Sequence, residues 1–300
     1  METTSIINIG LGLILAPLLP GIINKTKASF AGRTGPPLLQ AYFDIIKQLK
    51  KSVVYSKTTS WIFRAGPLVS LAAVLLALTI VPMGGITAPL AFSGDLLLLA
   101  YILGLMRFFT VIAALDTGSS FEGMGASREV LYSALAEPAL LIGLAAIARE
   151  TKTMSLSQLL PMAHFFSPEI VLVVAALMVV FLCENARIPF DDPNTHLELT
   201  MIHEVMVLDH SGPDFAFILY SSALKFWVLG LVIIGIIFPS PAGSFRLLSS
   251  VIAVFGLLLL AVVVGIIEST MARLRLVRIP QLLVAAGSLS AFAFILVMRQ

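Results

Sequence analysis

Eight long apolar stretches constrain the fold of this chain more than any other feature of its sequence. They lie at residues 6–23, 61–82, 96–115, 130–148, 168–185, 215–238, 247–267 and 280–298. A helix needs about 20 apolar residues to cross the hydrocarbon core of a bilayer, with about 17 as the lower limit. We therefore predict an all-α, polytopic membrane protein with about eight transmembrane helices, forming a single integral membrane domain over residues 1–300.

The overall composition excludes several other classes of protein. Hydrophobic residues make up 58% of the chain and charged residues 12%, whereas soluble domains carry about 25% charged residues. The net charge of +2 provides no basic field for nucleic acid. The single cysteine, Cys183, cannot hold an iron–sulfur cluster or a structural zinc ion alone. We therefore expect no nucleic-acid partner and no cofactor in this chain.

No motif for catalysis or metal binding is visible in the sequence. A Walker loop, a His-Glu-x-x-His motif and a Gly-x-Ser-x-Gly elbow are all absent. His196 and His203 are seven residues apart, and Glu204 follows the second, so a helix could bring them together. Solvated or interface histidines are favoured over a metal site here. We expect a chain that is not catalytic on its own.

Basic residues in the loops predict the orientation of the chain. Because lysine and arginine concentrate in cytoplasmic loops, the first and seventh loops are expected to be cytoplasmic. We therefore predict a multi-pass protein of the cell's inner (cytoplasmic) membrane, with both termini on the non-cytoplasmic side. The basic residues of these two loops are Lys25, Lys27, Arg33, Lys47, Lys50, Lys51, Lys57 and Arg64, then Arg273, Arg275 and Arg278.

Two segments outside the apolar stretches carry further patterns. Residues 37–51 alternate apolar and polar side chains at helical spacing, which predicts a cytoplasmic amphipathic helix at the membrane surface or under a partner. Residues 184–214 form a predicted acidic cytoplasmic loop in which Arg187 is the only arginine or lysine. The acids of this loop are Glu184, Asp191, Asp192, Glu198, Glu204, Asp209 and Asp214.

Three charged residues lie well inside the apolar stretches, away from their ends: Arg107, Glu137 and Lys225. A charge at a helix centre costs at least about 2.5–3.5 kcal/mol, so such residues face the bundle interior and are often part of an ion or proton path. A buried salt bridge that only holds helices together is the alternative, and it is equally favoured for Arg107. For Glu137 the path is favoured, and Pro138 is expected to break the helix beside it.

Residues 184–191 read Glu-Asn-Ala-Arg-Ile-Pro-Phe-Asp. This string strongly resembles a motif of the complex I subunit 1 family, which includes the matching membrane subunits of energy-converting nickel–iron hydrogenases. The segment 32–40, with Asp44 and Lys47, is similar to the family's Arg-x-Gly-Pro…Gln…Asp…Lys motif. Arg128 and Glu137 are similar to the family's arginine and glutamate of the fourth span.

Other strings resemble the hydrogenase branch, the membrane subunits of formate hydrogenlyase and of hydrogenase-4. They are Leu-Asp-Thr-Gly-Ser-Ser-Phe at 115–121, Gly-Ala-Ser-Arg-Glu at 125–129 and Glu-Ser-Thr-Met-Ala-Arg-Leu-Arg at 268–275. Lys225 agrees with this branch, because complex I usually has an acid near that position. Asn194 and His196 replace glutamates of the complex I pattern, which argues against a quinone chamber of the complex I type.

The resemblance implies a membrane-anchoring, ion-coupling subunit that docks a peripheral redox module. It implies hydrogenase large and small subunit-like partners, an iron–sulfur subunit and antiporter-like membrane subunits, with the nickel–iron centre and the clusters in those partners. The implied proton or ion path comprises Glu137, Glu184, Asp191, Glu198, Lys225 and Arg128. We expect Lys225 to balance Glu137 or to relay charge onward, and Arg187 to hold the acidic loop by pairing with a neighbouring acid. The implied loop-structuring or docking residues are Arg33, Gln40, Asp44, Lys47, Arg187, Pro189, Phe190, Glu204 and Asp209.

Two other functions remain open from the sequence. The first is the quinone-site subunit of a complex I-type NADH dehydrogenase, in which residues 32–47 would line the quinone tunnel. The second is a stand-alone ion transporter, which is less favoured because eight spans without a visible repeat are unusual for common transporter folds.

Overall fold

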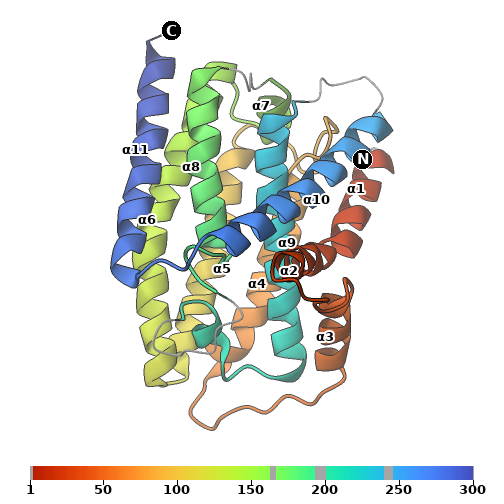
Figure 1. Ribbon diagram of the computed structural model, residues 1–300, viewed down its shortest axis with the longest axis vertical. Helices are drawn as coiled ribbons and strands as arrows, with labels where there is room; N and C mark the ends of the chain where they lie inside the picture. The colour runs from red at the N-terminus through yellow and green to blue at the C-terminus, as the bar shows by residue number, and fades with distance from the viewer. Residues whose placement is uncertain (1–2, 163–166, 193–200, 240–245, 300) are drawn as a thin grey trace.

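The computed structural model describes residues 3–162, 167–192, 201–239 and 246–299, and helices dominate this part of the chain (Figure 1). The α-helices are α1 (Thr3–Leu15), α2 (Leu18–Phe30), α3 (Gln40–Leu49), α4 (Trp61–Ile80), α5 (Asp95–Asp116), α6 (Ser120–Thr151), α7 (Leu156–Met162), α8 (Pro168–Glu184), α9 (Gly212–Ile237), α10 (Arg246–Thr270) and α11 (Ile279–Met298). The 3₁₀ helices are η1 (Glu204–Val207) and η2 (Leu276–Arg278).

The long helices are those that the apolar stretches predict. Among the described residues, six helices are long and apolar enough to cross a membrane, namely α4, α5, α6, α9, α10 and α11. The pair α1–α2 makes a seventh if it crosses as one span. Helix α8 has 17 residues, at the lower limit for a crossing. The chain is thus an all-α, multi-pass membrane protein, and length and composition alone identify six or seven spans of the eight predicted.

Two of the predicted spans differ in shape from the expectation. The first is not one helix, because α1 and α2 meet at a bend of 45° around Ala16 and Pro17. Proline lacks a backbone N–H and its ring collides with the preceding turn, so a helix bends there. In contrast, α6 is a single helix of 32 residues that continues through Pro138, so the expected break there is wrong. Packing of α8 and α11 against α6 supports the continuous helix.

Most long helices run side by side, whereas α10 crosses the front of the bundle obliquely (Figure 1). Helix α2 packs against α10, and α3 packs against α9. Helix α9 lies deep in the bundle, where Phe226 and Trp227 are fully buried. The oblique α10 starts near one end of the bundle and ends part-way along it, and the segment that follows it contacts the loop after α8 (Figure 1).

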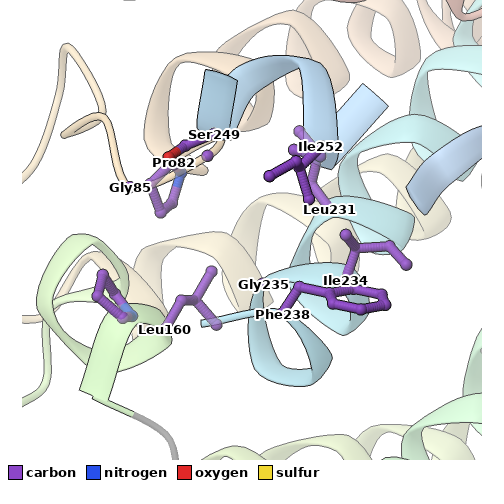
Figure 2. Close-up of a pocket in the computed structure, with 12 residues that line it drawn as sticks. Pro82, Gly85, Leu160, Leu231, Ile234, Gly235, Phe238, Ser249 and Ile252 are labelled. Atoms are coloured by element: carbon purple, nitrogen blue, oxygen red, sulfur yellow. The ribbon is translucent and has the colours of Figure 1, made fainter. Parts of the chain in front are cut away.

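The two ends of the bundle differ in character. At the end that carries α3, which we call the α3 end, the hydroxyl of Tyr55 donates to Asp214 at 2.8 Å and joins the loop after α3 to the start of α9. At the far end, the loop after α4 and the helices α7, α9 and α10 surround a cavity of about 20 Å³ (Figure 2). Leu160, Ile234 and Phe238 are among the residues that line this small cavity, and no lining residue is ionisable. The titratable groups gather instead toward the α3 end.

Candidate functional site

Arg107, on α5 within the bundle, binds three carboxylates at once. Its Nε atom donates to Glu129 Oε1 at 3.1 Å. Its two terminal nitrogens donate to Glu137 and Glu184. The planar guanidinium group suits this task because it presents five N–H donors in a fixed fork.

Lys225 and His203 extend this set of charges. The Lys225 Nζ atom lies 2.8 Å from Glu184 Oε2, and His203 Nε2 lies 3.4 Å from Glu129 Oε2. We call the six connected residues the Arg107 cluster: Arg107, Glu129, Glu137, Glu184, His203 and Lys225. The cluster joins α5, α6, α8, α9 and the residue that precedes η1.

The cluster is buried at one side and exposed at the other. The side chains of Arg107 and Glu184 are 10% and 4% exposed, whereas that of Glu137 is 47% exposed. Charges out of water require partners, and these pairs supply them. The cluster therefore runs from the interior of the bundle to the outer face of α6.

A cavity of about 890 Å³ lies beside the buried part of the cluster. It is bounded by α4, α5, α9 and η1, and by Gln48, Lys51 and Ser52 at the α3 end. Five cluster members line it: Arg107, Glu129, Glu184, His203 and Lys225. Water or a ligand that enters this cavity from the α3 end therefore meets the cluster directly.

Two titratable groups outside the membrane-spanning helices also line this cavity. Burial, reinforced by Asp191 and Asp192 and opposed by Arg187, raises the pKa of Glu204 to about 7. Burial lowers the pKa of His210 to about 4, and its ring stacks on Phe63 with the ring centres 3.9 Å apart. Near neutral pH, Glu204 can therefore exchange a proton, whereas His210 stays neutral.

Asp191, predicted as part of the ion path, organises the backbone in the structure. Its Oδ2 atom accepts the backbone N–H groups of Ile202 and His203 at 3.0 and 3.1 Å. Arg273 donates to its Oδ1 atom at 2.9 Å. The carboxyl group is 3% exposed and thus ties two distant segments together.

The neighbouring loop residues have structural partners as well. Arg187 faces Glu268 of α10 at 3.5 Å instead of an acid of its own loop, which corrects the expectation of a neighbouring partner. The carbonyl oxygen of Pro189 accepts from Leu274 N–H at 3.0 Å, and Phe190 is 1% exposed. These three residues hold the loop in place and are turned inward.

The remaining predicted residues lie apart from the cluster. Arg128 donates to the Met201 carbonyl oxygen at 2.9 Å, and the backbone N–H of Asp209 donates to Glu122 at 3.0 Å. Gln40 donates to Asp44 on α3 at 2.9 Å. Arg33 and Lys47 are exposed near the same end. Glu198 and His196 lie outside the described residues.

The expected partner of Lys225 also differs from the observed one. Balance of Glu137 by Lys225 was one expectation, but Lys225 pairs with Glu184, while Arg107 binds Glu137. Sequence reasoning gave Arg107 no preferred role and did not single out Glu129 or Glu268. For Arg107 the signal was present, since an unpaired arginine in a span requires acids on neighbouring helices.

Comparison with known proteins agrees with this architecture. The model of the family described as NADH dehydrogenase matches residues 3–299. Formate hydrogenlyase subunit 4 of Escherichia coli (strain K12) is 33% identical over 94% of both chains. Hydrogenase-4 component C of the same organism is 33% identical over 94% of this chain and 91% of its own length.

More distant similarities extend to two other respiratory proteins. One subunit of the NADH-quinone oxidoreductase of Wolbachia pipientis wMel is 24% identical over 68% of this chain and 67% of its own. A chain in the structure of the membrane-bound sulfane sulfur reductase, an archaeal respiratory membrane complex, shares the fold with a TM-score of 0.85. That similarity covers 98% of both chains at 20% sequence identity. By its family match and its relatives, the chain belongs to the NADH dehydrogenase family of complex I subunit 1-like membrane proteins.

Proposed function

We propose that this chain is the membrane-anchoring, ion-coupling subunit of an energy-converting hydrogenase or formate hydrogenlyase-like complex. It docks a peripheral redox module and links electron transfer to the movement of protons or sodium ions. The relatives named formate hydrogenlyase subunit 4 and hydrogenase-4 component C support the choice of complex. The nickel–iron centre and iron–sulfur clusters would lie in large, small and iron–sulfur partner subunits.

The observation that carries this proposal is the continuity of the Arg107 cluster from the cavity to the outer face of α6. Its three carboxylates face two permanent cations, so one negative charge is in excess while His203 is neutral. A proton on His203 or on a carboxyl group would neutralise that excess. Because the members share Arg107, a charge that arrives at Glu184 alters the balance at Glu137.

The half-exposed carboxyl group of Glu137 indicates where the charge would go next. It lies on the outer face of a spanning helix, where a bare carboxylate toward lipid is costly. An antiporter-like membrane subunit that covers this face would remove that cost and receive the charge. Lateral transfer to such a partner is therefore part of the proposal.

The α3 end would be the docking surface for the peripheral module and would face the cytoplasm of a cell with an inner membrane. Four apolar side chains, three on α3 and one on the residue before it, form an exposed stripe one helical turn apart, and the large cavity opens beside it. The stripe consists of Leu39, Phe43, Ile46 and Leu49. With this end cytoplasmic, both termini would lie on the other side of the membrane.

Purification from the native membrane, followed by reconstitution, tests the proposal. Partners would be identified by mass spectrometry, nickel and iron assayed, and ion movement measured in liposomes during electron transfer. Glu137→Gln is expected to keep electron transfer and to reduce the ions moved per electron at least tenfold, since charge no longer passes Arg107.

Asp95→Asn is the matched control for this substitution. Asp95 is fully buried at the other end of α5, where it accepts from Ser155 Oγ at 2.9 Å and from the backbone N–H of Leu156 at 2.7 Å. The Asp95→Asn substitution is expected to lower the stability of the complex and to leave the number of ions moved per electron unchanged. A fully coupled Glu137→Gln complex, or a chain without any redox partner, would refute the proposal.

The large cavity favours one second candidate, a quinone site. Its volume of about 890 Å³ lies within the range of about 300–1,000 Å³ for small-molecule sites. None of residues 32–47 lines it, so the tunnel expected at those positions would instead run past Gln48 and Lys51. Saturable binding of a short-chain quinone to the complex, abolished by Ser70→Trp in the cavity wall, would establish this candidate.

A further inference from the structure

The segment at the end of α10 holds the loop after α8 at three points. Glu268 Oε1 lies 3.5 Å from Arg187 Nη1. The backbone N–H of Leu274 donates to the Pro189 carbonyl oxygen at 3.0 Å. Arg273 donates to Asp191 at 2.9 Å. Residues 268–274 therefore clamp residues 187–191, although about 80 residues separate them in the chain.

Glu268 is the most deeply placed residue of this clamp. Its side chain is 0% exposed, and its second oxygen lies 2.8 Å from Lys27 Nζ of α2. Arg187 is 12% exposed and also lies over the ring of Phe226 on α9, 5.8 Å from its centre. One carboxylate thus joins α2, α10 and the loop after α8, and its loss would leave two cations facing each other.

The clamped loop reaches the Arg107 cluster from two sides. Glu184, which binds Arg107 and Lys225, ends α8 only three residues before Arg187. Asp191 accepts the backbone N–H of His203, whose side chain faces Glu129. Glu268 therefore holds Arg187, close to Glu184 in the chain. Arg273 holds Asp191, which in turn binds the backbone of His203.

We propose that Glu268 and Arg273 are positioning residues that hold Glu184 and His203 in the Arg107 cluster, so that the end of α10 controls the geometry of charge transfer. This inference rests on the proposed function for its consequence, and on the three clamp contacts for its structural part. Neither residue belongs to the predicted ion path. The oblique course of α10 across the bundle brings the clamp to this place (Figure 1).

Glu268→Gln in the intact, purified complex tests the structural part by hydrogen–deuterium exchange. We expect amide exchange in residues 187–191 and at His203 to become about tenfold faster, because a broken buried ion pair opens the segment locally. Glu268→Asp keeps the charge and should restore most of the protection. Unchanged exchange at these amides in Glu268→Gln would overturn the proposal.

Ion movement and electron transfer, measured together in liposomes, test the consequence. Glu268→Gln should lower the number of ions moved per electron about threefold or more, whereas Asp95→Asn should lower stability without changing this ratio or the exchange of 187–191. Arg187→Gln combined with Glu268→Gln should be no worse than Glu268→Gln alone, because Glu268→Gln has already removed the ion pair with Arg187. Additive effects, or an unchanged ratio, would overturn the positioning role.

The two measurements separate this inference from the proposed function. A wild-type complex that moves no ions would refute the proposed function, whereas the exchange rates would still decide whether the clamp holds the loop.

Discussion

Arg107 is the residue that holds the Arg107 cluster together. Among the described residues, it alone joins α5 to carboxylates on both α6 and α8. Arg107→Gln should destabilise the folded complex by about 3–5 kcal/mol, because Glu129 and Glu184 would remain buried without their main partner. Thermal unfolding of the detergent-solubilised complex measures this change.

Arg107→Lys is the informative companion to that substitution. It keeps the positive charge but loses the planar fork, so it can reach fewer of the three carboxylates. The stability of Arg107→Lys is expected to lie between that of the wild type and that of Arg107→Gln. Equal stability of Arg107→Lys and the wild type would contradict the role assigned to the fork.

The raised pKa of Glu204 predicts how the stability of the folded protein changes with pH. In the unfolded chain its pKa lies near 4.5, whereas burial raises it to about 7 in the folded protein. Between these pH values the folded state binds more protons, so its contribution to stability is lost as the pH rises toward 7. Glu204→Gln should therefore stabilise the protein at pH 8, by about 1 kcal/mol after allowance for its partial exposure, and change little at pH 4.

Unfolding midpoints at pH 4 and pH 8 measure this effect. Asp209→Asn removes an exposed carboxyl group five residues away and serves as the control. An equal effect of Glu204→Gln at both pH values would show that its carboxyl group is not held in its protonated form.

Contacts between elements explain why η1 sits where it does. Gly125 of α6 faces η1 so closely that a Cβ atom there would lie 2.9 Å from the Ile202 carbonyl oxygen and would collide with Val205. Gly125→Ala should therefore cost about 1–3 kcal/mol and displace the segment that carries His203 and Glu204.

Gly123, two residues earlier on the same helix, provides a matched control. A Cβ atom there meets nothing within 4 Å, so Gly123→Ala should be neutral or stabilise α6 by about 0.5–1 kcal/mol. Comparison of the two unfolding midpoints checks the prediction. Equal effects of the two alanines would contradict the close packing of α6 against η1.

The sequence predicts the helices of this protein better than the contacts between distant segments. Apolar length alone places the spanning helices, and the helical spacing of apolar residues places α3, because both are local properties of the chain. The bend at Pro17 has a local cause, but the continuous apolar stretch at residues 6–23 led to the prediction of a single helix there. The partners of Arg187 and Asp191 were beyond prediction, because Glu268 and Arg273 are about 80 residues away and no local pattern encodes such a pair.

At the scale of the whole molecule, the outer face of α6 is where a second membrane subunit is expected. Ala134 lies on this exposed face, one turn before Glu137. Ala134→Trp should reduce co-purification of antiporter-like subunits about tenfold or more while the peripheral module stays bound, since a bulky side chain blocks close helix packing. Quantitative mass spectrometry of the purified complex measures both.

Leu259→Trp provides the control on another exposed surface. Leu259 is 48% exposed on α10, so the same bulky side chain there should leave the subunit composition unchanged. Loss of the membrane partners in both variants would mean a general failure of assembly, and loss in neither would exclude the α6 face as their binding site.

The pairing of Arg107 with two acids of α6 also bears on how the chain enters the membrane during synthesis. Helix α5 emerges first with an unpaired arginine, whose insertion alone costs about 2.5–3.5 kcal/mol. Only three residues separate α5 from α6, which brings Glu129 and Glu137. We expect these two helices to leave the translocon together as a hairpin, with the positive charge of Arg107 already paired. Nascent chains truncated just after α5 should therefore insert poorly, and chains that extend through α6 should insert well.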